Sequence, residues 1–178
     1  MSKSLDLGCG PSPRNPFLSD EVFGIDVKTF NSPNISAVDL VLDSIPFEDN
    51  TFDYVTGFDF LEHIPRIIYT GEGGRQPFID LMSEVWRVLK PNGQTFFATP
   101  AFPTPEAFQD PQHVNIITEN SIGYFSAPGL LELCQAYGFK GKFDVVQQSW
   151  ATVPIKITEN SYYSIVPYHL IWHLKAVK

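Results

Sequence analysis

The sequence is poor in cysteine and in positive charge, and it contains no long apolar run. Only two cysteines, Cys9 and Cys134, occur in 178 residues, so neither a disulfide framework nor the spacing of a metal site is present, and both thiols are expected to be buried fillers. Lysine and arginine number 12 against 20 aspartate and glutamate residues, which argues against nucleic-acid and anionic-membrane binding. Without a membrane-spanning run or a signal-peptide pattern, the chain is expected to be cytoplasmic and to bind no metal.

The remaining composition is that of a folded protein. Apolar residues make up 43% of the chain and charged residues 18%, as in ordinary globular domains. A chain of 178 residues is long enough to bury one hydrophobic core. We therefore expect a single domain over residues 1–178, without repeats or linkers.

A glycine turn near the start, in segment 4–10 (SLDLGCG), organises the chain. The apolar run ends in Gly8-x-Gly10, which is typical of a buried strand that enters a turn at the carboxyl edge of a parallel sheet. Glycine reaches backbone angles that other residues avoid and lets a ligand approach the main chain. Asp6 adds a carboxylate near the strand tip. By itself the segment fits a ligand-binding turn and a plain strand–loop turn equally well.

Apolar periodicity and turn residues predict an alternation of strands with helices or turns. Such an alternation indicates a mostly parallel sheet with ligands outside its carboxyl ends, and the last two strands suggest an antiparallel edge pair. Three prolines between residues 11 and 16 leave room for at most a turn or two of helix there. The expected strands are 5–7, 22–27, 37–42, 52–56, 94–99, 143–146 continuing toward 153, and 168–177; the expected helices are 58–63, 77–90 and 126–137.

Asp26 ends the second expected strand, 16 residues after Gly10. In dinucleotide-type folds an acidic residue about 20 residues beyond the glycines holds ribose hydroxyls. The alternative is a strand-end aspartate that caps a turn. A nicotinamide-dependent oxidoreductase fits poorly, because Pro13 stands where its third glycine is needed.

Five motifs occur in an order that resembles a known family. They are LDLGCG (5–10), GID (24–26), LDSIPFEDNTFDYV (42–55), LEHI (61–64) and RVLKPNG (87–93). Together they resemble class I S-adenosylmethionine-dependent methyltransferases of the small type 11 kind, over residues 4–100. DPQHV (110–114) and the YGF at 137–139 are also similar to that family, and beyond about residue 140 the likeness is only architectural.

The resemblance implies an α/β fold with a Rossmann-like, doubly wound, mostly parallel sheet. It also implies an antiparallel hairpin at the C-terminal edge and reduced helices on one side. Residues 4–100 would form the cofactor-binding half, and residues 101–178 would supply substrate-side loops, a helix and the terminal strand pair.

The resemblance further implies S-adenosylmethionine as cofactor, with S-adenosylhomocysteine as product. The glycine turn would lie against the methionine part, and Asp26 would hold the ribose. Asp43 and Ser44 would bind the adenine, and Phe58 with its neighbours would close over the methionine end. The implied cofactor residues are Asp6, Gly8, Cys9, Gly10, Asp26, Val27, Asp43, Ser44, Phe58, Asp59 and His63, of which His63 has a structural role as its alternative.

Two departures from the family pattern bear on the site. Ser12 stands where the family has a third glycine, and Pro13 follows it. The usual N-terminal helix, which often covers cofactor and substrate, is missing. We therefore expect an open site that a second copy of the chain or a partner chain covers.

Methyl transfer is an in-line displacement at an activated carbon, so alignment and exclusion of water are the main tasks of the protein. His113, beside Asp110, is the expected catalytic pair for proton abstraction or substrate orientation. Its alternative is a histidine that anchors its own loop. His169 and His173, four residues apart on a strand, are expected at the surface rather than at a metal.

The sequence thus predicts methyl transfer to a small acceptor, partly apolar because residues 100–125 and 154–168 are rich in Phe, Tyr and Pro. The alternative is a non-catalytic methyltransferase-like module that binds a protein partner. Retention of Asp6, Asp26 and Asp43 opposes it, because a module without a cofactor has no use for three ligand-facing carboxylates.

Overall fold

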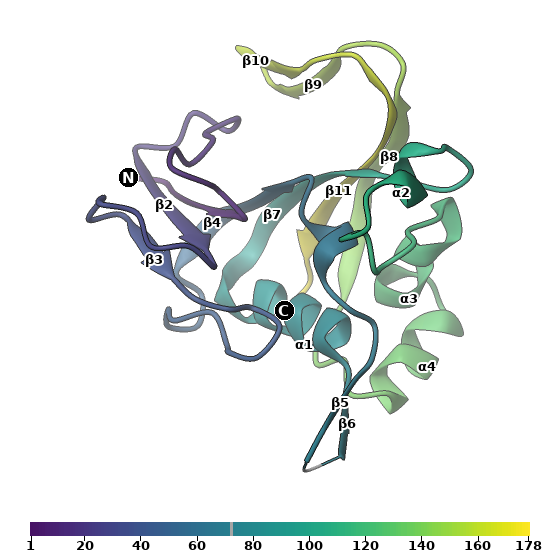
Figure 1. Ribbon diagram of the computed structural model, residues 1–178. Coiled ribbons are helices and arrows are strands. Elements are labelled where there is room, and N and C mark those ends of the chain that lie inside the picture. Colours follow the sequence, from purple (N-terminus) through teal and green to yellow (C-terminus); the bar gives the residue numbers. More distant parts are fainter. Residues whose placement is uncertain (72) are drawn as a thin grey trace.

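A seven-stranded sheet forms the centre of the computed structural model, which describes residues 1–71 and 73–178 (Figure 1). The strand order is β3-β2-β1-β4-β7-β11-β8. The first five strands in this order run parallel, and β11 pairs antiparallel with both β7 and β8. The strands are β1 (Lys3–Leu7), β2 (Glu21–Asp26), β3 (Ile35–Ala37), β4 (Phe52–Phe58), β7 (Leu89–Pro100), β8 (Phe143–Ala151) and β11 (Val166–Ala176). The predicted mostly parallel α/β sheet with an antiparallel C-terminal edge is confirmed.

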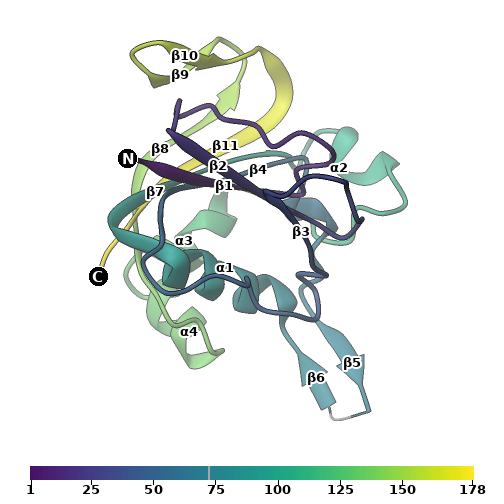
Figure 2. The same cartoon turned by 90° about the vertical axis from the view of Figure 1, so that its left-hand side faces the viewer.

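The helices gather on one side of the sheet. Figure 2 shows α1, α3 and α4 on this side and the hairpin β9–β10 above the opposite face. None of the helices in the described residues is both long and apolar enough to cross a membrane. The helices are η1 (Leu61–His63), α1 (Pro77–Val88), α2 (Glu106–Gln109), η2 (Glu119–Ile122), α3 (Gly123–Ser126) and α4 (Leu130–Ala136); the small hairpins are β5 (Ile68–Thr70) with β6 (Gly73–Arg75) and β9 (Ile155–Thr158) with β10 (Ser161–Tyr163).

The main core lies between the sheet and α1. Pro77 begins this helix, where its missing N–H costs nothing. Phe78, Leu81, Met82 and Val85 are buried on one face, as the helical spacing predicted. The helix ends at Val88, because Leu89 is extended and begins β7 instead.

A smaller core covers the opposite face, where loop residues replace helices. Phe17 stacks on Tyr54 with ring centroids 4.1 Å apart, and it packs in one cluster with residues of β7, β9 and β11. His169 and His173 lie on this face and are only 3% and 6% exposed. The surface position expected for both histidines is therefore wrong, because Phe17 packs against His173 and Tyr163 against His169 over this face of β11.

The third strand is shorter and earlier than predicted. It ends at Ala37, and the segment 37–42 that was expected to form it is mostly a turn. Asp39 causes this turn, since its Oδ1 accepts a 3.0 Å hydrogen bond from the N–H of Val41, and its carbonyl oxygen accepts from the next two N–H groups. Leu40 is buried, so the apolar pattern reflects a turn packed onto the core.

The helix predicted over 126–137 is two short helices. Ser126 ends α3, and its Oγ donates to the carbonyl of Ile122 at 3.0 Å, so it is not an N-cap. Gly129, with φ of +83°, allows the chain to turn before α4. The segment between the last two expected strands contains the hairpin β9–β10. Strands β5 and β6 also pair antiparallel, and residue 72, between them, is outside the described residues.

Arg87, the first residue of the motif at 87–93, makes contacts to the motif at 42–55. Its guanidinium donates to the carbonyls of Ile45 and Phe47, each at 2.8 Å. It also pairs with Glu84 at 2.7 Å and Asp49 at 2.9 Å, and the Glu84 contact is the main reason that the pKa of Arg87 is raised. The arginine therefore holds the segment after β3 against α1.

Candidate functional site

Two hollows open at the edge where the parallel strands end. The β2 hollow has a volume of about 380 Å³ and is lined by Gly8, Ile25, Asp26, Val27, Val38, Asp39, Leu40, Val41, Asp59, Phe60, His63, Ile64 and Gln112. The β10 hollow has a volume of about 630 Å³ and is lined by Arg14, Asn15, Pro16, Phe58, Asp59, Ile157, Tyr162, Tyr163, Ser164, Val166, Tyr168 and His169. Asp59 lines both, so the two hollows adjoin at this residue.

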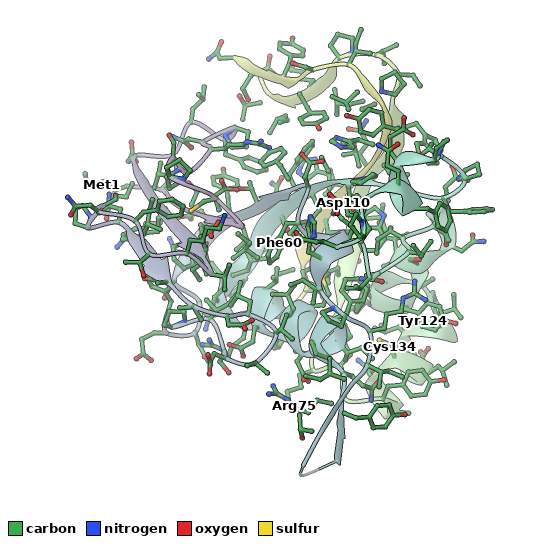
Figure 3. All side chains as sticks on the ribbon, in the orientation of Figure 1. Met1, Phe60, Arg75, Asp110, Tyr124 and Cys134 are labelled. Carbon is green, nitrogen blue, oxygen red and sulfur yellow. The ribbon has the colours of Figure 1, made fainter. Side chains whose placement is uncertain are left out.

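The glycine turn after β1 forms one wall of the β2 hollow. Gly8 and Gly10 have φ of +65° and +60°, which few other residues adopt. A Cβ on Gly8 would lie 2.6 Å from Cδ2 of Phe60, and Figure 3 shows Phe60 near the middle of the molecule. Beside Gly10 a Cβ would meet nothing within 4 Å. The turn thus needs glycine at both positions for its backbone, but only Gly8 also needs the space.

Alanine at the two turn glycines is expected to have unequal effects. Gly10→Ala should cost about 1 kcal/mol in the free energy of unfolding, from backbone strain alone. Gly8→Ala should cost about 1–3 kcal/mol more, because Phe60 must move. Urea unfolding of both variants measures this, and equal losses would show that Phe60 moves at no cost.

Asp26 lies at the end of β2 and holds the glycine turn. Its Oδ2 accepts from the N–H of Gly10 and its Oδ1 from the N–H of Lys28, each at 2.9 Å. A carboxylate has about four lone-pair positions, so each oxygen can accept a further bond from a ligand in the hollow. Val27, next to it, is 67% exposed at the rim.

Asp6 lies beneath the site and does not line either hollow. It is 2% exposed, and its carboxylate accepts from the N–H of Arg14 at 2.8 Å and from Oγ1 of Thr56 at 2.7 Å. Burial raises the pKa of Asp6 from 3.8 to about 6, against the opposing effect of these hydrogen bonds. Asp6 thus holds the loop that carries Arg14. Cys9 does not line either hollow, and burial raises the pKa of its thiol to about 11.

The raised pKa of Asp6 predicts a pH-dependent stability. The protonated carboxyl favours the folded state, so this stabilisation is complete below about pH 4 and is lost as the pH rises through about 6, by roughly 3 kcal/mol. Asp6→Asn cannot ionise, so its stability relative to the wild type should rise between pH 4.5 and 7.5. Urea unfolding at both pH values measures the difference, with Asp144→Asn as exposed control. An offset between wild type and Asp6→Asn that stays constant with pH would contradict the assignment.

Asp43 and Ser44, predicted at the adenine, line a separate small hollow of about 30 Å³ together with Arg75 and Glu84. Asp39 lines the β2 hollow near Asp26 instead. The sequence predicts Asp39 inside a strand, so Asp39 is not among the residues expected at the site. Its position directly after a strand end would have marked it, had that strand been ended at Ala37.

Asp59, His169 and Tyr163 form a chain of polar contacts at the β10 hollow. His169 Nε2 lies 2.7 Å from Asp59 Oδ1, and His169 Nδ1 contacts the hydroxyl of Tyr163. Burial raises the pKa of Asp59, but the hydrogen bond and charge of His169 outweigh it, so the pKa is lowered overall. Burial raises the pKa of Tyr163. At neutral pH an ionised aspartate, an imidazole and a neutral phenol are therefore aligned.

His113 and Asp110, the predicted catalytic pair, line neither hollow. Asp110 is exposed and its Oδ1 accepts from the N–H of Gln112 at 2.8 Å, an ordinary turn. His113 Nδ1 contacts the carbonyl of Glu106 at 3.0 Å. Its Nε2 lies 4.0 Å from Oε1 of the buried Glu62, as does Nε2 of His63.

Comparison with known proteins gives the family. The model of the methyltransferase domain family matches residues 2–142. A demethylmenaquinone methyltransferase of Staphylococcus saprophyticus is 34% identical over 125 residues, which are 61% of this chain and 48% of that protein. The chain thus spans about half the length of the curated relatives it matches.

Solved structures agree in fold at low sequence identity. The 1,6-didemethyltoxoflavin-N1-methyltransferase of Burkholderia thailandensis, with bound 1,6-didemethyltoxoflavin and S-adenosylhomocysteine, matches with a TM-score of 0.60 and 11% identity, over 99% of this chain and 72% of that one. A Haloferax volcanii complex between the Trm112 methyltransferase activator and a methyltransferase matches with a TM-score of 0.60 and 13% identity, over 99% and 83%. The resemblance and the fold that the motifs indicated are confirmed, and the chain belongs to the methyltransferase domain family.

Proposed function

We propose that this chain transfers a methyl group from S-adenosylmethionine, held in the β2 hollow, to a small acceptor held in the β10 hollow. The observation that carries the proposal is the position of Asp59, which lines both hollows. A donor and an acceptor bound in adjoining hollows can meet in line without leaving the protein, and such alignment supplies most of the catalysis in a displacement.

The chemistry of the β2 hollow fits the cofactor. Asp26 has lone pairs available for a ribose diol, and Asp39 presents a second carboxylate for the adenine amino group. S-adenosylmethionine, when bound, supplies a methyl group already activated on a sulfonium. The chain's residues therefore need only hold the cofactor, align the acceptor and exclude water.

The β10 hollow suits an acceptor with an apolar ring and a negative substituent. Phe58 and Tyr163 stack with centroids 5.7 Å apart, and the guanidinium carbon of Arg14 lies 4.6 Å from the centre of the Phe58 ring. The named activity of the staphylococcal relative also uses a ring acceptor. Residues 101–178 supply most of this hollow, but Arg14 and Phe58 come from the half proposed to bind the cofactor.

The chain of Asp59, His169 and Tyr163 is proposed to take the acceptor's proton. An ionised Asp59 favours the imidazole tautomer with hydrogen on Nε2, so Nδ1 accepts from the Tyr163 hydroxyl. The phenolic oxygen then accepts from an acceptor O–H or N–H. As the acceptor is methylated, its proton passes through Tyr163 to His169, and Asp59 stabilises the resulting imidazolium. His169 therefore replaces His113 as the proposed base.

A second chain is proposed to cover the β2 hollow, in line with the exposed Val27 at its rim. The Haloferax neighbour, which was solved together with an activator, shows that this fold accommodates such a partner in that protein. A second copy of this chain is one such partner, so sedimentation of the free and cofactor-loaded protein is the direct measurement.

Paired carboxylate variants test the cofactor site. Asp39→Asn keeps the turn but loses the charge, and should weaken S-adenosylhomocysteine binding about tenfold by calorimetry. Asp43→Asn, in the separate hollow, should leave the dissociation constant unchanged. If Asp43→Asn weakens S-adenosylhomocysteine binding and Asp39→Asn does not, Asp43 is the adenine ligand.

Transfer itself is tested with methyl-labelled S-adenosylmethionine and a panel of small phenols, quinols, carboxylated rings and amines. Release of S-adenosylhomocysteine above the acceptor-free rate supports the proposal. Binding of S-adenosylhomocysteine without transfer to any acceptor, alone or with a partner, would favour the non-catalytic module.

A further inference from the structure

Glu62, His63 and His113 bring three potential metal ligands together beside the β2 hollow. Oε1 of Glu62 lies 4.0 Å from Nε2 of His63 and 4.0 Å from Nε2 of His113. One ligand atom from each residue lies within 4.8 Å of the other two, and the two imidazole rings meet edge to face with centroids 5.0 Å apart. Two imidazoles and one carboxylate are a common ligand set for zinc and related ions.

Both histidines already have the orientation of metal ligands. Nδ1 of His63 lies 3.2 Å from the carbonyl of Gln112, and Nδ1 of His113 lies 3.0 Å from the carbonyl of Glu106. A carbonyl only accepts hydrogen bonds, so each Nδ1 carries the hydrogen, and each Nε2 directs its lone pair toward Glu62. Metal-binding histidines are typically fixed by such a second contact.

The burial of Glu62 is a second observation, independent of the distances between the three ligand atoms. It is 1% exposed, and its Oε2 accepts a 2.7 Å hydrogen bond from Oγ1 of Thr99. Its Oε1, also buried, has no hydrogen-bond partner among the residues that the structure describes. A buried carboxylate oxygen without a partner is costly, and here it points between two imidazole nitrogens. A cation at this place would satisfy it.

The backbone makes the cluster rigid. The carbonyl of Glu62 accepts from the N–H groups of Val114 and Asn115, each at 2.9 Å, and the Asn115 side chain donates to the carbonyl of Leu61 at 3.1 Å. The segment that carries His113 is therefore held directly against η1. Figure 1 shows this segment, after α2, passing beside η1.

We propose that Glu62, His63 and His113 bind a divalent transition-metal ion of the zinc class, a site that goes beyond methyl transfer. At metal–ligand distances of about 2.0–2.2 Å, ligand atoms in a tetrahedron are roughly 3.4 Å apart. The two separations from Oε1 of Glu62, each 4.0 Å, need to close by about half an ångström. His63 and Gln112 also line the β2 hollow, so the cluster lies beside it. The sequence concealed this set, because His113 is distant from the Glu62-His63 pair in the chain.

The test uses untagged full-length protein, freed of metal by a chelator, and zinc or cobalt chloride alone. Calorimetry should show one equivalent of zinc bound with micromolar or tighter affinity. Cobalt should develop the visible absorption of a low-symmetry site with nitrogen and oxygen ligands. Neither cysteine is expected to compete, since burial raises the pKa of Cys9 and Cys134 to about 11. The measurement needs no cofactor or acceptor, so its result does not depend on whether the proposed methyl transfer is correct.

Variants decide the ligand set. His113→Gln and Glu62→Gln should each weaken zinc binding by about 100-fold or more and remove the cobalt spectrum. His173→Gln, a buried histidine on β11 outside the cluster, is the matched control and should bind zinc as the wild type does. If Glu62→Gln does not fold, His113→Gln alone decides. Absence of stoichiometric binding to folded wild type, or binding unaffected in His113→Gln, would overturn the proposal.

Discussion

Asp26→Ala is expected to remove measurable binding of S-adenosylhomocysteine. In the proposed site this carboxylate accepts two ribose hydroxyls, and hydrogen bonds to a charged group contribute about 1.5–3 kcal/mol each. Their loss corresponds to roughly 10²–10⁴ in the dissociation constant. The same change also frees the N–H of Gly10, which Asp26 holds at 2.9 Å, so the turn loosens as well. Calorimetric titration measures the loss.

Two further variants separate binding from turn geometry. Asp26→Asn retains one oxygen to hold the N–H of Gly10 and should fall between wild type and Asp26→Ala. Asp144→Asn, an exposed change on β8, should bind like the wild type. A dissociation constant for Asp26→Ala within about threefold of the wild-type value would exclude Asp26 as the ribose ligand.

His169→Gln is expected to lower kcat by about 10²–10⁴-fold with the best acceptor of the panel, which is the usual contribution of a positioned proton acceptor. Glutamine keeps contacts to both neighbours but does not take up a proton at neutral pH. Tyr163→Phe removes the hydroxyl that His169 contacts and should lower kcat in the same direction.

His173→Gln provides the control for burial and strand position. His173 lies four residues further along β11, is also buried, and contacts Oε1 of Gln94 at 2.6 Å through its Nε2. Burial lowers its pKa, and it lines neither hollow. Its substitution should reduce stability without changing kcat. If His169→Gln and His173→Gln lower kcat equally, the effect of His169 is structural and the proton relay is wrong.

Local sequence was sufficient for the parts of the fold that depend on near neighbours. The glycine turn follows from two glycines directly after an apolar strand, and Asp26 was found because it ends the next strand. Helix α1 follows from apolar residues three and four positions apart, with proline at its start. The prolines between 11 and 16 correctly excluded a long helix after the first strand. In each case the deciding interaction spans only a few residues.

Predictions from local sequence were wrong where a turn has the apolar pattern of a strand or a helix. Val38, Leu40 and Val41 are apolar because they pack on the core and the hollow, yet Asp39 bends the chain between them. Pattern alone does not distinguish apolar residues of a packed turn from those of a short strand. The strand predicted over 37–42 therefore directed the expected adenine contact to Asp43, whereas the proposed contact is Asp39.

The sequence by itself determined the mostly parallel sheet, the glycine turn, the carboxylate at the end of β2 and the family. Tertiary structure alone decided which distant side chains meet. Asp59 reaches His169 only because β11 inserts between β7 and β8, and Glu62 reaches His113 only because backbone hydrogen bonds hold the segment after α2 against η1. These two contacts join residues 110 and 51 positions apart. They depend on how the whole sheet packs, which no local pattern contains.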